Sequence, residues 1–414
     1  MWLQGGVHGN EPAGEQCLLA LVGHMEANQC WTKFILSKLD ILILPRYNPE
    51  GAARFQRTTS SNLDLNRDHI KLSCQLTRDI KQLFNSFAPH VAADMHEYSS
   101  SKKYAGTFLH ASDALFAAAK NLNINEDIRK ISENLFATNI GTALEAAGLR
   151  WGPYSTGSSD STLEPSIQLK EAGSDGKIGR NAMGLTQIIS FVCETRGITL
   201  ADQHFQRRTA TGLVMVESIV QTAADHADEL FRVLTNDNRS FIESNEDVVV
   251  IDSTVETIRM FQMVNLNNGK LENVPVRYGS VNTRTANLKR ARPEAYLIPL
   301  KWSHVARRLE LLGLEVTIMS QVFRSPAEAL MIVSVTFGNT YEEGIVPVQV
   351  ATSTIKKEIE LPCGSFAVST RQRNAALAFI ALEPENVDSY VASNIIPVVQ
   401  GEEYPVYRLM ASCD

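Results

Sequence analysis

The pattern of apolar and polar residues changes once along the chain, and the first pattern covers residues 1–235. Short apolar runs of strand length are followed there by patterns with an apolar residue every three or four positions, as in amphipathic helices. Strands are predicted at residues 1–4, 38–44, 91–95 and 187–193. Helices are predicted at residues 71–87, at residues 211–234 and from Pro12 onward, with an apolar stripe of Cys17, Leu18, Leu21, Val22 and Met25. The alternation predicts an α/β fold, with a mostly parallel or mixed sheet flanked by helices.

The second pattern, in the rest of the chain, consists of short runs typical of β-strands, interrupted by two helical patterns. Strands are predicted at residues 248–251, 257–264, 295–299, 346–350 and 366–369, and helices near residues 302–312 and 372–382. We therefore expect two domains, at residues 1–235 and 240–414, the second being a smaller β-rich α+β domain. Residues 154–184 are rich in Ser, Gly, Asp and Pro, so a long loop is predicted there, and such loops are usually functional or mobile.

Charge and composition exclude several classes of protein. Lys and Arg number 39 against 46 Asp and Glu, for a net charge of −7, which argues against nucleic acid as a partner. No apolar run approaches the roughly 18–20 residues of a membrane span. The six cysteines lie far apart without a C-x-x-C pair, so they indicate neither a disulfide scaffold nor a thiolate zinc site. The chain opens on MWLQGG, which lacks the features of a signal peptide, and the sequence indicates neither compartment nor oligomeric state.

Two short motifs contain candidate metal ligands. His8 and Glu11 lie in a glycine-rich turn after the first predicted strand, and His96 lies at the carboxyl end of another. Two histidines and a carboxylate are a common zinc ligand set that leaves a fourth position for water. In parallel sheets the carboxyl ends of strands collect at one edge, so these residues are expected to meet. Alone, an H-x-x-E pattern occurs often by chance, and a strand-end histidine is more often structural.

Two further motifs suggest chemistry on an anionic substrate. Arg57, Asn66 and Arg67 follow the second predicted strand, and a guanidinium binds a carboxylate with two parallel hydrogen bonds. Glu194 leaves an apolar strand, where a carboxylate beside a metal would act as general base. Considered alone, each arginine is more typical of a surface ion pair, and Glu194 is more typical of an ion-pair partner of Arg196. Asp68 or Glu97 could orient a ligand histidine.

The order of these motifs resembles that of the zinc carboxypeptidase family, the carboxypeptidase A-like metallopeptidases. The matching segments, within residues 5–197, are HGNE, NPEG followed by Arg57, NLDLNRD, DMHEY and FVCETRG. GRN at residues 179–181 and the later segments RPEAYLIP and EEYPVYRL resemble a bacterial and fungal branch with an extra C-terminal domain. Members of the family are often secreted.

The resemblance implies a metallocarboxypeptidase that hydrolyses C-terminal peptide bonds with one Zn²⁺ per chain, in a catalytic domain at residues 1–235. Zinc activates a water molecule, Glu194 serves as general base and acid, and Arg57 polarises the scissile carbonyl. Asn66 and Arg67 hold the substrate's terminal carboxylate. The implied zinc ligands are His8, Glu11 and His96.

The sequence departs from the family in two places. The family has strands and a helix before HGNE, whereas little precedes it here, so a short sheet with an exposed edge or a missing layer is expected. A substrate-capping tyrosine usually lies roughly twenty residues before the catalytic glutamate, and residues 165–193 contain none. Tyr154 is the nearest candidate on that side, with Tyr98 and Tyr104 on the other.

Two other functions fit the same motifs. Zinc amidohydrolases that deacylate N-acyl amino acids, such as aspartoacylase and succinylglutamate desuccinylase, share a similar core, G-G-x-H-G-N-E and D-L-N-R included. Their substrates are small anionic acyl-amino acids rather than peptides. The third hypothesis is a binding protein that retains the zinc pocket but has weak or no turnover. It is motivated by the missing tyrosine and the short N-terminus.

Overall fold

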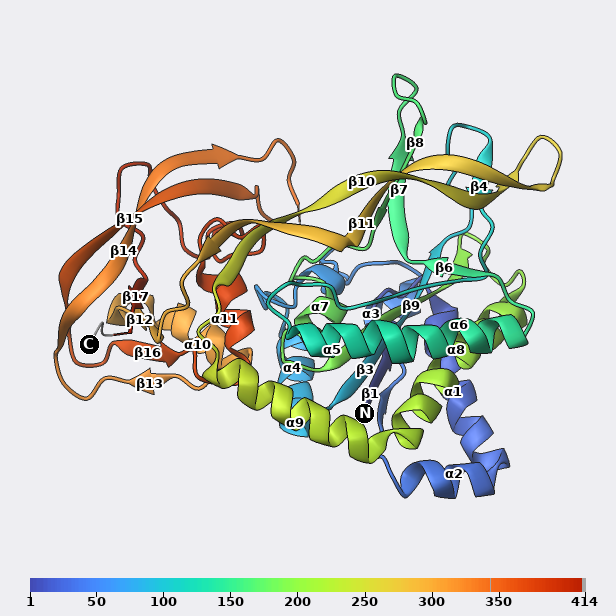
Figure 1. Cartoon of the computed structure of the whole chain (residues 1–414), viewed down its shortest axis with the longest axis horizontal. Helices are drawn as coiled ribbons and strands as arrows, with labels where there is room; N and C mark the ends of the chain where they lie inside the picture. Colours follow the sequence, from blue (N-terminus) through green and yellow to red (C-terminus); the bar gives the residue numbers. More distant parts are fainter. Residues whose placement is uncertain (343, 412–414) are drawn as a thin grey trace.

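The computed structural model describes residues 1–342 and 344–411, except the side chains of residues 281–283. The described residues form three sheets (Figure 1). An α/β part with the first sheet occupies one side of the molecule, and a β-rich part with the third sheet occupies the other. The second sheet, dominated by a long hairpin, extends above the α/β part.

The central sheet has six strands in the order β2-β1-β3-β9-β5-β6. Strands β2, β1, β3 and β9 are parallel, β5 is antiparallel to β9, and β6 is parallel to β5. The sheet is therefore mixed, as predicted. Its strands are β1 (Trp2–Gly5), β2 (Leu42–Leu44), β3 (Val91–Ser99), β5 (Ala114–Ala118), β6 (Trp151–Pro153) and β9 (Ile189–Ile198). The prediction of a strand at 38–44 was too long, because only its last three residues pair with β1.

Helices cover this sheet, and their apolar faces build the core. The helices of the α/β part are α1 (Pro12–Ala27), α2 (Gln29–Leu36), α3 (Pro49–Arg54), η1 (Leu65–Arg67), α4 (Gln75–Phe87), α5 (Glu126–Ile131), η2 (Ser132–Ala137), α6 (Thr138–Ala146), α7 (Gly179–Gly184), α8 (Phe205–Asp225) and α9 (Ala227–Glu243). Pro12 lies in the first turn of α1, where its missing N–H costs no hydrogen bond. Leu18 and Leu21 are fully buried, but Val22 is 47% exposed, so the predicted stripe was one residue too wide.

The second sheet corrects two predictions. Its strands are β4 (Phe108–His110), β7 (Ser155–Ser159), β8 (Ile167–Glu171), β10 (Val248–Asn265) and β11 (Leu271–Arg290), in the order β4-β10-β11-β8-β7. Residues 154–184, predicted as a loop, thus contain two strands and helix α7. The two runs predicted at 248–251 and 257–264 are one strand. Strand β7 (STGSS) contains no apolar residue, and the middle of β10 is exposed, so neither shows the continuous apolar pattern from which its full length could be predicted.

The third sheet follows β11 and has the order β13-β16-β12-β17-β14-β15. Its elements are β12 (Ala295–Ile298), η3 (Leu300–Trp302), α10 (Ser303–Leu311), β13 (Thr317–Ile318), β14 (Phe323–Phe337), β15 (Val348–Leu361), β16 (Phe366–Ser369), α11 (Ala375–Leu382) and β17 (Tyr407–Leu409). Every residue of α11 is buried, and its apolar cluster continues into the core of the α/β part. The division into domains at 1–235 and 240–414 remains a prediction.

The predicted helix at 211–234 is two helices that meet at His226. The His226 N–H still bonds the Thr222 carbonyl, and α9 continues in a new direction across the base of the α/β part (Figure 1). None of the described helices combines the length and the apolar character that crossing a membrane requires. The five cysteines in the described ranges are free thiols.

Candidate metal centre and active site

The four sequence motifs meet at the carboxyl ends of the central strands. His8 and Glu11 lie in the turn between β1 and α1, and Glu11 is the residue that precedes the helix. His96 lies near the end of β3, and Glu194 is its direct partner on the neighbouring parallel strand β9. Gly9 packs so closely on Gly51 of α3 that a Cβ atom would lie 1.9 Å from the Gly51 carbonyl carbon. A side chain at Gly9 would therefore displace the HGNE turn from the NPEG segment.

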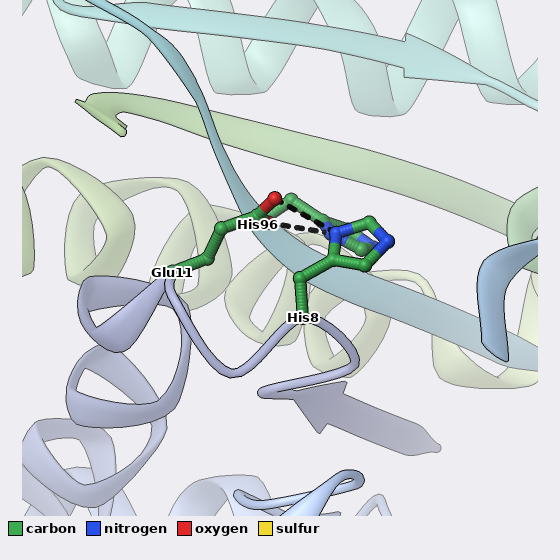
Figure 2. Close-up of side chains that lie close together, drawn as sticks. All are labelled: His8, Glu11 and His96. Atoms are coloured by element: carbon green, nitrogen blue, oxygen red, sulfur yellow. Dashed lines mark hydrogen bonds and ion pairs between the residues drawn. The ribbon is translucent and has the colours of Figure 1, made fainter. Parts of the chain in front are cut away.

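His8, Glu11 and His96 form a compact buried cluster (Figure 2). Glu11 Oε1 lies 2.8 Å from His8 Nδ1, and its Oε2 lies 2.9 Å from His96 Nδ1. The two Nδ1 atoms are 3.1 Å apart. The Glu97 N–H also donates to Glu11 Oε2 at 3.0 Å, which fixes the carboxylate from behind. One ligand atom from each of the three residues therefore points at a common centre.

Two aspartates orient the histidine rings. Asp64 Oδ1 lies 3.1 Å from His8 Nε2, and Asp94 Oδ2 lies 3.0 Å from His96 Nε2. A carboxylate beside Nε2 favours the hydrogen on that nitrogen and leaves a lone pair on Nδ1. Two Nδ1 lone pairs at 3.1 Å repel each other unless a proton or a metal ion lies between them. The donor set of two imidazoles and a carboxylate therefore fits zinc.

Charges around the cluster favour a cation at its centre. Burial lowers the pKa of His96, but Asp94 and Glu11 outweigh burial and raise that pKa well above its usual value. Burial alone would raise the pKa of Glu11, yet His8 and His96 hold it far below the usual range. The carboxylate is thus ionised, and the centre attracts positive charge, whether a proton or a metal ion.

The Arg57 guanidinium reaches the cluster from one side. Its Nη1 lies 3.3 Å from His8 Nδ1 and 3.4 Å from Glu11 Oε1, and its Nε donates to Asp64 Oδ2 at 2.9 Å. Arg57 is therefore held beside the centre by the same aspartate that orients His8. Its side chain is 39% exposed, so one face remains open to a substrate.

Asn66 and Arg67 lie in η1, directly after Asp64. Asp64 Oδ1 accepts the Asn66 N–H at 2.8 Å, and Asn66 Oδ1 accepts the Gly179 N–H at 2.7 Å. Arg67 donates from Nη1 to the Asn66 carbonyl at 2.9 Å and lines a cavity together with Arg57. The arginines are thus on one side of the cluster, with open space beside them.

Glu194 lies on β9 opposite His96 and is 5% exposed. Burial raises the pKa of Glu194 to about 7; Glu11 adds to the rise, while His96, His8 and a hydrogen bond from the Tyr154 hydroxyl oppose it. Tyr154 comes immediately before β7, and its backbone N–H donates to the Phe116 carbonyl at 2.9 Å. A carboxylate with a pKa near neutrality can both accept and return a proton.

Asp68 and Glu97 were predicted as possible partners that orient a ligand histidine, but other carboxylates make these contacts. Asp68 accepts the N–H groups of Ser73 and Cys74, and Glu97 pairs with Arg208 at 2.8 Å, whereas Asp64 and Asp94 face the histidines. The signal for Asp94 was present, since residues two apart on a strand point to the same face. Asp64 and Tyr154 have no such sequence signal, because only the tertiary fold brings them to the site.

Comparisons with known proteins point to one family. A family model described as zinc carboxypeptidase matches residues 1–129. A carboxypeptidase 2 from Trichophyton equinum is 50% identical over 411 residues, which cover 99% of this chain and 76% of the relative. A carboxypeptidase 2 from Trichophyton rubrum shows the same identity and coverage.

Two solved structures are similar at lower identity. A metallo-carboxypeptidase from Burkholderia cenocepacia is 16% identical, with a TM-score of 0.39 over 55% of this chain and 57% of that one. Bovine thrombin-activatable fibrinolysis inhibitor, solved with tick carboxypeptidase inhibitor, is 20% identical, with a TM-score of 0.39 over 55% of this chain and 82% of that one. The identity to the fungal relatives over nearly the whole chain, rather than these alignments, carries the assignment of a family.

Proposed function

The chain belongs to the zinc carboxypeptidase family, and on this premise we propose that it removes C-terminal residues from peptides with one zinc ion per chain. The observation that carries the proposal is the convergence of His8, Glu11 and His96 ligand atoms within 4.8 Å of one another, beside Arg57 and Glu194. His8 and His96 would bind the ion through Nδ1 and Glu11 through its carboxylate. Zinc bound there acts as a Lewis acid toward water and the scissile carbonyl.

Glu194 is the proposed proton carrier. It accepts a proton from the attacking water and returns it to the leaving amine, so one carboxylate serves as base and then as acid. Its burial and its raised pKa support this role, because a group near neutrality gives up a bound proton readily. The Tyr154 hydroxyl donates to Glu194 and orients its carboxylate.

Arg57, Asn66 and Arg67 are the proposed substrate-binding residues. Arg57 donates to the carbonyl oxygen as negative charge develops on it, which stabilises the transition state. Arg67 binds the terminal carboxylate through its guanidinium fork, and the Asn66 amide assists from the adjoining position. Because the carboxylate is held at a fixed distance from Arg57, only the last peptide bond lies in reach of Glu194.

A comparison of free and amidated peptides tests the proposal. Blocked dipeptides with a free C-terminus should be hydrolysed, their C-terminal amides should be poor substrates, and a chelator should remove zinc and activity together. Equal cleavage of both kinds of peptide would contradict the carboxylate clamp. Hydrolysis of N-acetyl aspartate or N-succinyl glutamate in preference to peptides would identify an amidohydrolase. Zinc binding without turnover on any of these substrates would indicate a binding protein.

A further inference from the structure

The GRN segment at residues 179–181 opens helix α7, and neither the metal cluster nor the proposed substrate contacts account for it. All three of its residues are buried. The Gly179 N–H donates to Asn66 Oδ1 at 2.7 Å, and a Cβ atom at Gly179 would lie 2.8 Å from Asp94 Oδ2. Because Gly179 has no side chain, the start of α7 can approach the carboxylate that orients His96.

Arg180, the second residue of the segment, is a buried cation with a side chain that is 1% exposed. Its Nη2 donates to the Gly173 carbonyl, and its Nε has no hydrogen-bond partner in the part of the chain that the structure describes. Burial lowers the pKa of Arg180, while nearby groups that include Tyr154 and Glu194 oppose the fall. A methionine would fill similar space without the cost of burying a charge, so packing alone does not explain an arginine here.

The Gly173 carbonyl is held by two residues of the GRN segment. Asn181 Nδ2 donates to it at 2.9 Å, beside the bond from Arg180. The residue before Gly173, Ala172, donates its N–H to the Tyr154 carbonyl at 2.9 Å. Arg180 and Asn181 therefore fix the end of the strand segment on which the Tyr154 backbone rests.

The Tyr154 hydroxyl connects this segment to the proposed proton carrier, because it donates to Glu194. Burial raises the pKa of Tyr154, Glu194 adds to the rise, and Arg180 opposes it, so the guanidinium lies within electrostatic reach of the hydroxyl. A hydroxyl hydrogen rotates to suit its surroundings, and a cation near the oxygen favours the orientation in which the hydrogen points toward the carboxylate. Backbone support and charge thus act on Tyr154 in the same sense.

We propose that Arg180 is a positioning residue for the reaction, because its guanidinium holds the backbone beside Tyr154 and keeps the Tyr154 hydroxyl directed at Glu194. The inference rests on the proposed function, in which Glu194 carries the proton. Arg180 contacts neither the metal ligands nor the peptide in this role and acts through Tyr154. Loss of Arg180 should therefore slow turnover without changing metal content or peptide binding.

Two substitutions of Arg180 test the role by kinetics. In Arg180→Met, kcat should fall roughly 10- to 100-fold, the usual cost of a misplaced catalytic group, while KM and zinc content stay near wild-type values. Arg180→Lys should recover part of kcat, because an ammonium group still supplies a charge and a donor for the Gly173 carbonyl. An unchanged kcat in Arg180→Met, or a loss of zinc in that variant, overturns the inference.

Arg292→Met is the matched control. Arg292 is 6% exposed and also donates to backbone carbonyls, those of Phe241 and Thr370, which lie outside the metal centre. Its loss should lower the midpoint of urea unfolding but leave kcat of the folded protein at the wild-type value. Equal falls of kcat in Arg292→Met and Arg180→Met would show general damage to the fold and overturn the inference.

A double-mutant cycle with Tyr154→Phe tests whether Arg180 acts through the hydroxyl. Tyr154→Phe should lower kcat, and Arg180→Met should add no further loss in that background, because the group it positions is already absent. If Arg180→Met does not fold, the cycle is measured with Arg180→Lys, whose smaller loss should also vanish. Losses that multiply contradict the inference.

Crystal structures separate the position of Tyr154 from the reaction. In the wild type the Tyr154 hydroxyl should lie within hydrogen-bond distance of the Glu194 carboxylate, and in Arg180→Met it should have moved beyond that distance. An undisplaced Tyr154 in Arg180→Met contradicts the inference. If Tyr154 moves as expected but the wild type hydrolyses no peptide, the positioning role stands and the proposed function fails.

Discussion

The two parts of the molecule use buried charge in opposite ways. In the α/β part, ligand atoms of His8, Glu11 and His96 converge on one point, where their lone pairs repel each other without a cation. In the β-rich part, buried Arg408 pairs with buried Glu383 at 3.1 Å, and Arg290 at the end of β11 lies 2.9 Å from the same carboxylate. The first arrangement requires an ion from outside, whereas the second neutralises itself.

This difference distinguishes a charge cluster suited to catalysis from one that stabilises the fold. A cluster that needs a cation gains stability from metal binding, and its geometry is available for catalysis. A self-paired network holds its strands together and leaves no free charge for a substrate. Five substitutions test this contrast.

The largest effect is expected for His96→Ala. Two remaining ligands hold zinc poorly, so metal content should fall close to zero and activity at least about 10³-fold, since the metal's Lewis-acid contribution is worth several kcal/mol. Metal analysis of the purified protein measures the first change, and a peptidase assay the second. His24→Ala, at a half-exposed histidine that pairs with Glu217, is the control and should keep its zinc. Stoichiometric zinc in His96→Ala would place the metal elsewhere.

Glu194→Gln should separate metal binding from turnover in the same part. The amide is nearly isosteric but cannot accept a proton, so kcat should fall by roughly 10² to 10⁴-fold with zinc retained. Steady-state kinetics and metal analysis on one preparation give both quantities. Near-normal turnover would remove Glu194 from the proposed mechanism.

Glu383→Gln should have the reverse effect in the β-rich part. Arg290 and Arg408 lose a shared buried partner, and breaking such a pair destabilises a protein by about 3 kcal/mol. The midpoint of urea unfolding should fall, while zinc content and kcat/KM of the folded protein stay at wild-type values. Loss of zinc in this variant would show that the two parts are coupled more tightly than their charges suggest.

Arg67→Ala should change which peptides are cleaved rather than the chemistry. Loss of a bidentate pair with the terminal carboxylate should lower kcat/KM about 30-fold, or about 2 kcal/mol, and abolish discrimination between acid and amide. Arg67→Lys should recover only part of the loss. Arg57→Ala is the contrast, since it should slow both kinds of peptide equally. Acid and amide peptides that remain distinguished by Arg67→Ala would contradict the assignment.

The smallest effect is expected at Lys81, a charge in the α/β part that lacks a partner. Its Nζ has no hydrogen-bond partner in the part of the chain that the structure describes and lies 5.3 Å from the Phe84 ring centroid. Burial lowers the pKa of Lys81 to about 8. Lys81→Met should therefore stabilise the protein by roughly 1–2 kcal/mol at pH 7.

The pH dependence of this gain has a defined sign. Between the folded pKa of about 8 and the ordinary value of 10.5, the unfolded state binds more protons, so wild-type stability rises with pH. The advantage of Lys81→Met should be largest below pH 8 and vanish above pH 10.5. Urea titrations at pH 7 and pH 10 measure it, and an equal advantage at both values would contradict the burial of a charged ammonium.

The sequence was most informative where burial is two-sided. Strands β1, β3 and β9 are buried on both faces, so they read as apolar runs and were predicted. Strand β7, with the sequence STGSS, has no apolar residue and was predicted as loop, because its pairing with β8 depends on backbone hydrogen bonds.

The residues of the candidate site also fall into those that the sequence identified and those that it did not. His8, Glu11 and His96 were proposed from local motifs and their order, and the structure brings them together, while their roles remain predictions. Tyr154 was named as the nearest tyrosine to a missing cap; its hydrogen bond to Glu194 depends on the turn before β7 and has no sequence signal. Local patterns thus identify residues that act on a ligand, and tertiary structure supplies the residues that orient them.

The hairpin of β10 and β11 has a consequence for how such a chain can evolve. Its tip pairs with β4 at Phe108–His110, and β11 pairs with β8 at residues 168–170, so segments of the α/β part receive strand partners from beyond residue 240. A recombination crossover near residue 240 would therefore join β4 and β8 to strand partners from another parent. Short insertions should be tolerated better at a surface turn such as residues 266–270, which lies outside these pairings, than at the apparent boundary.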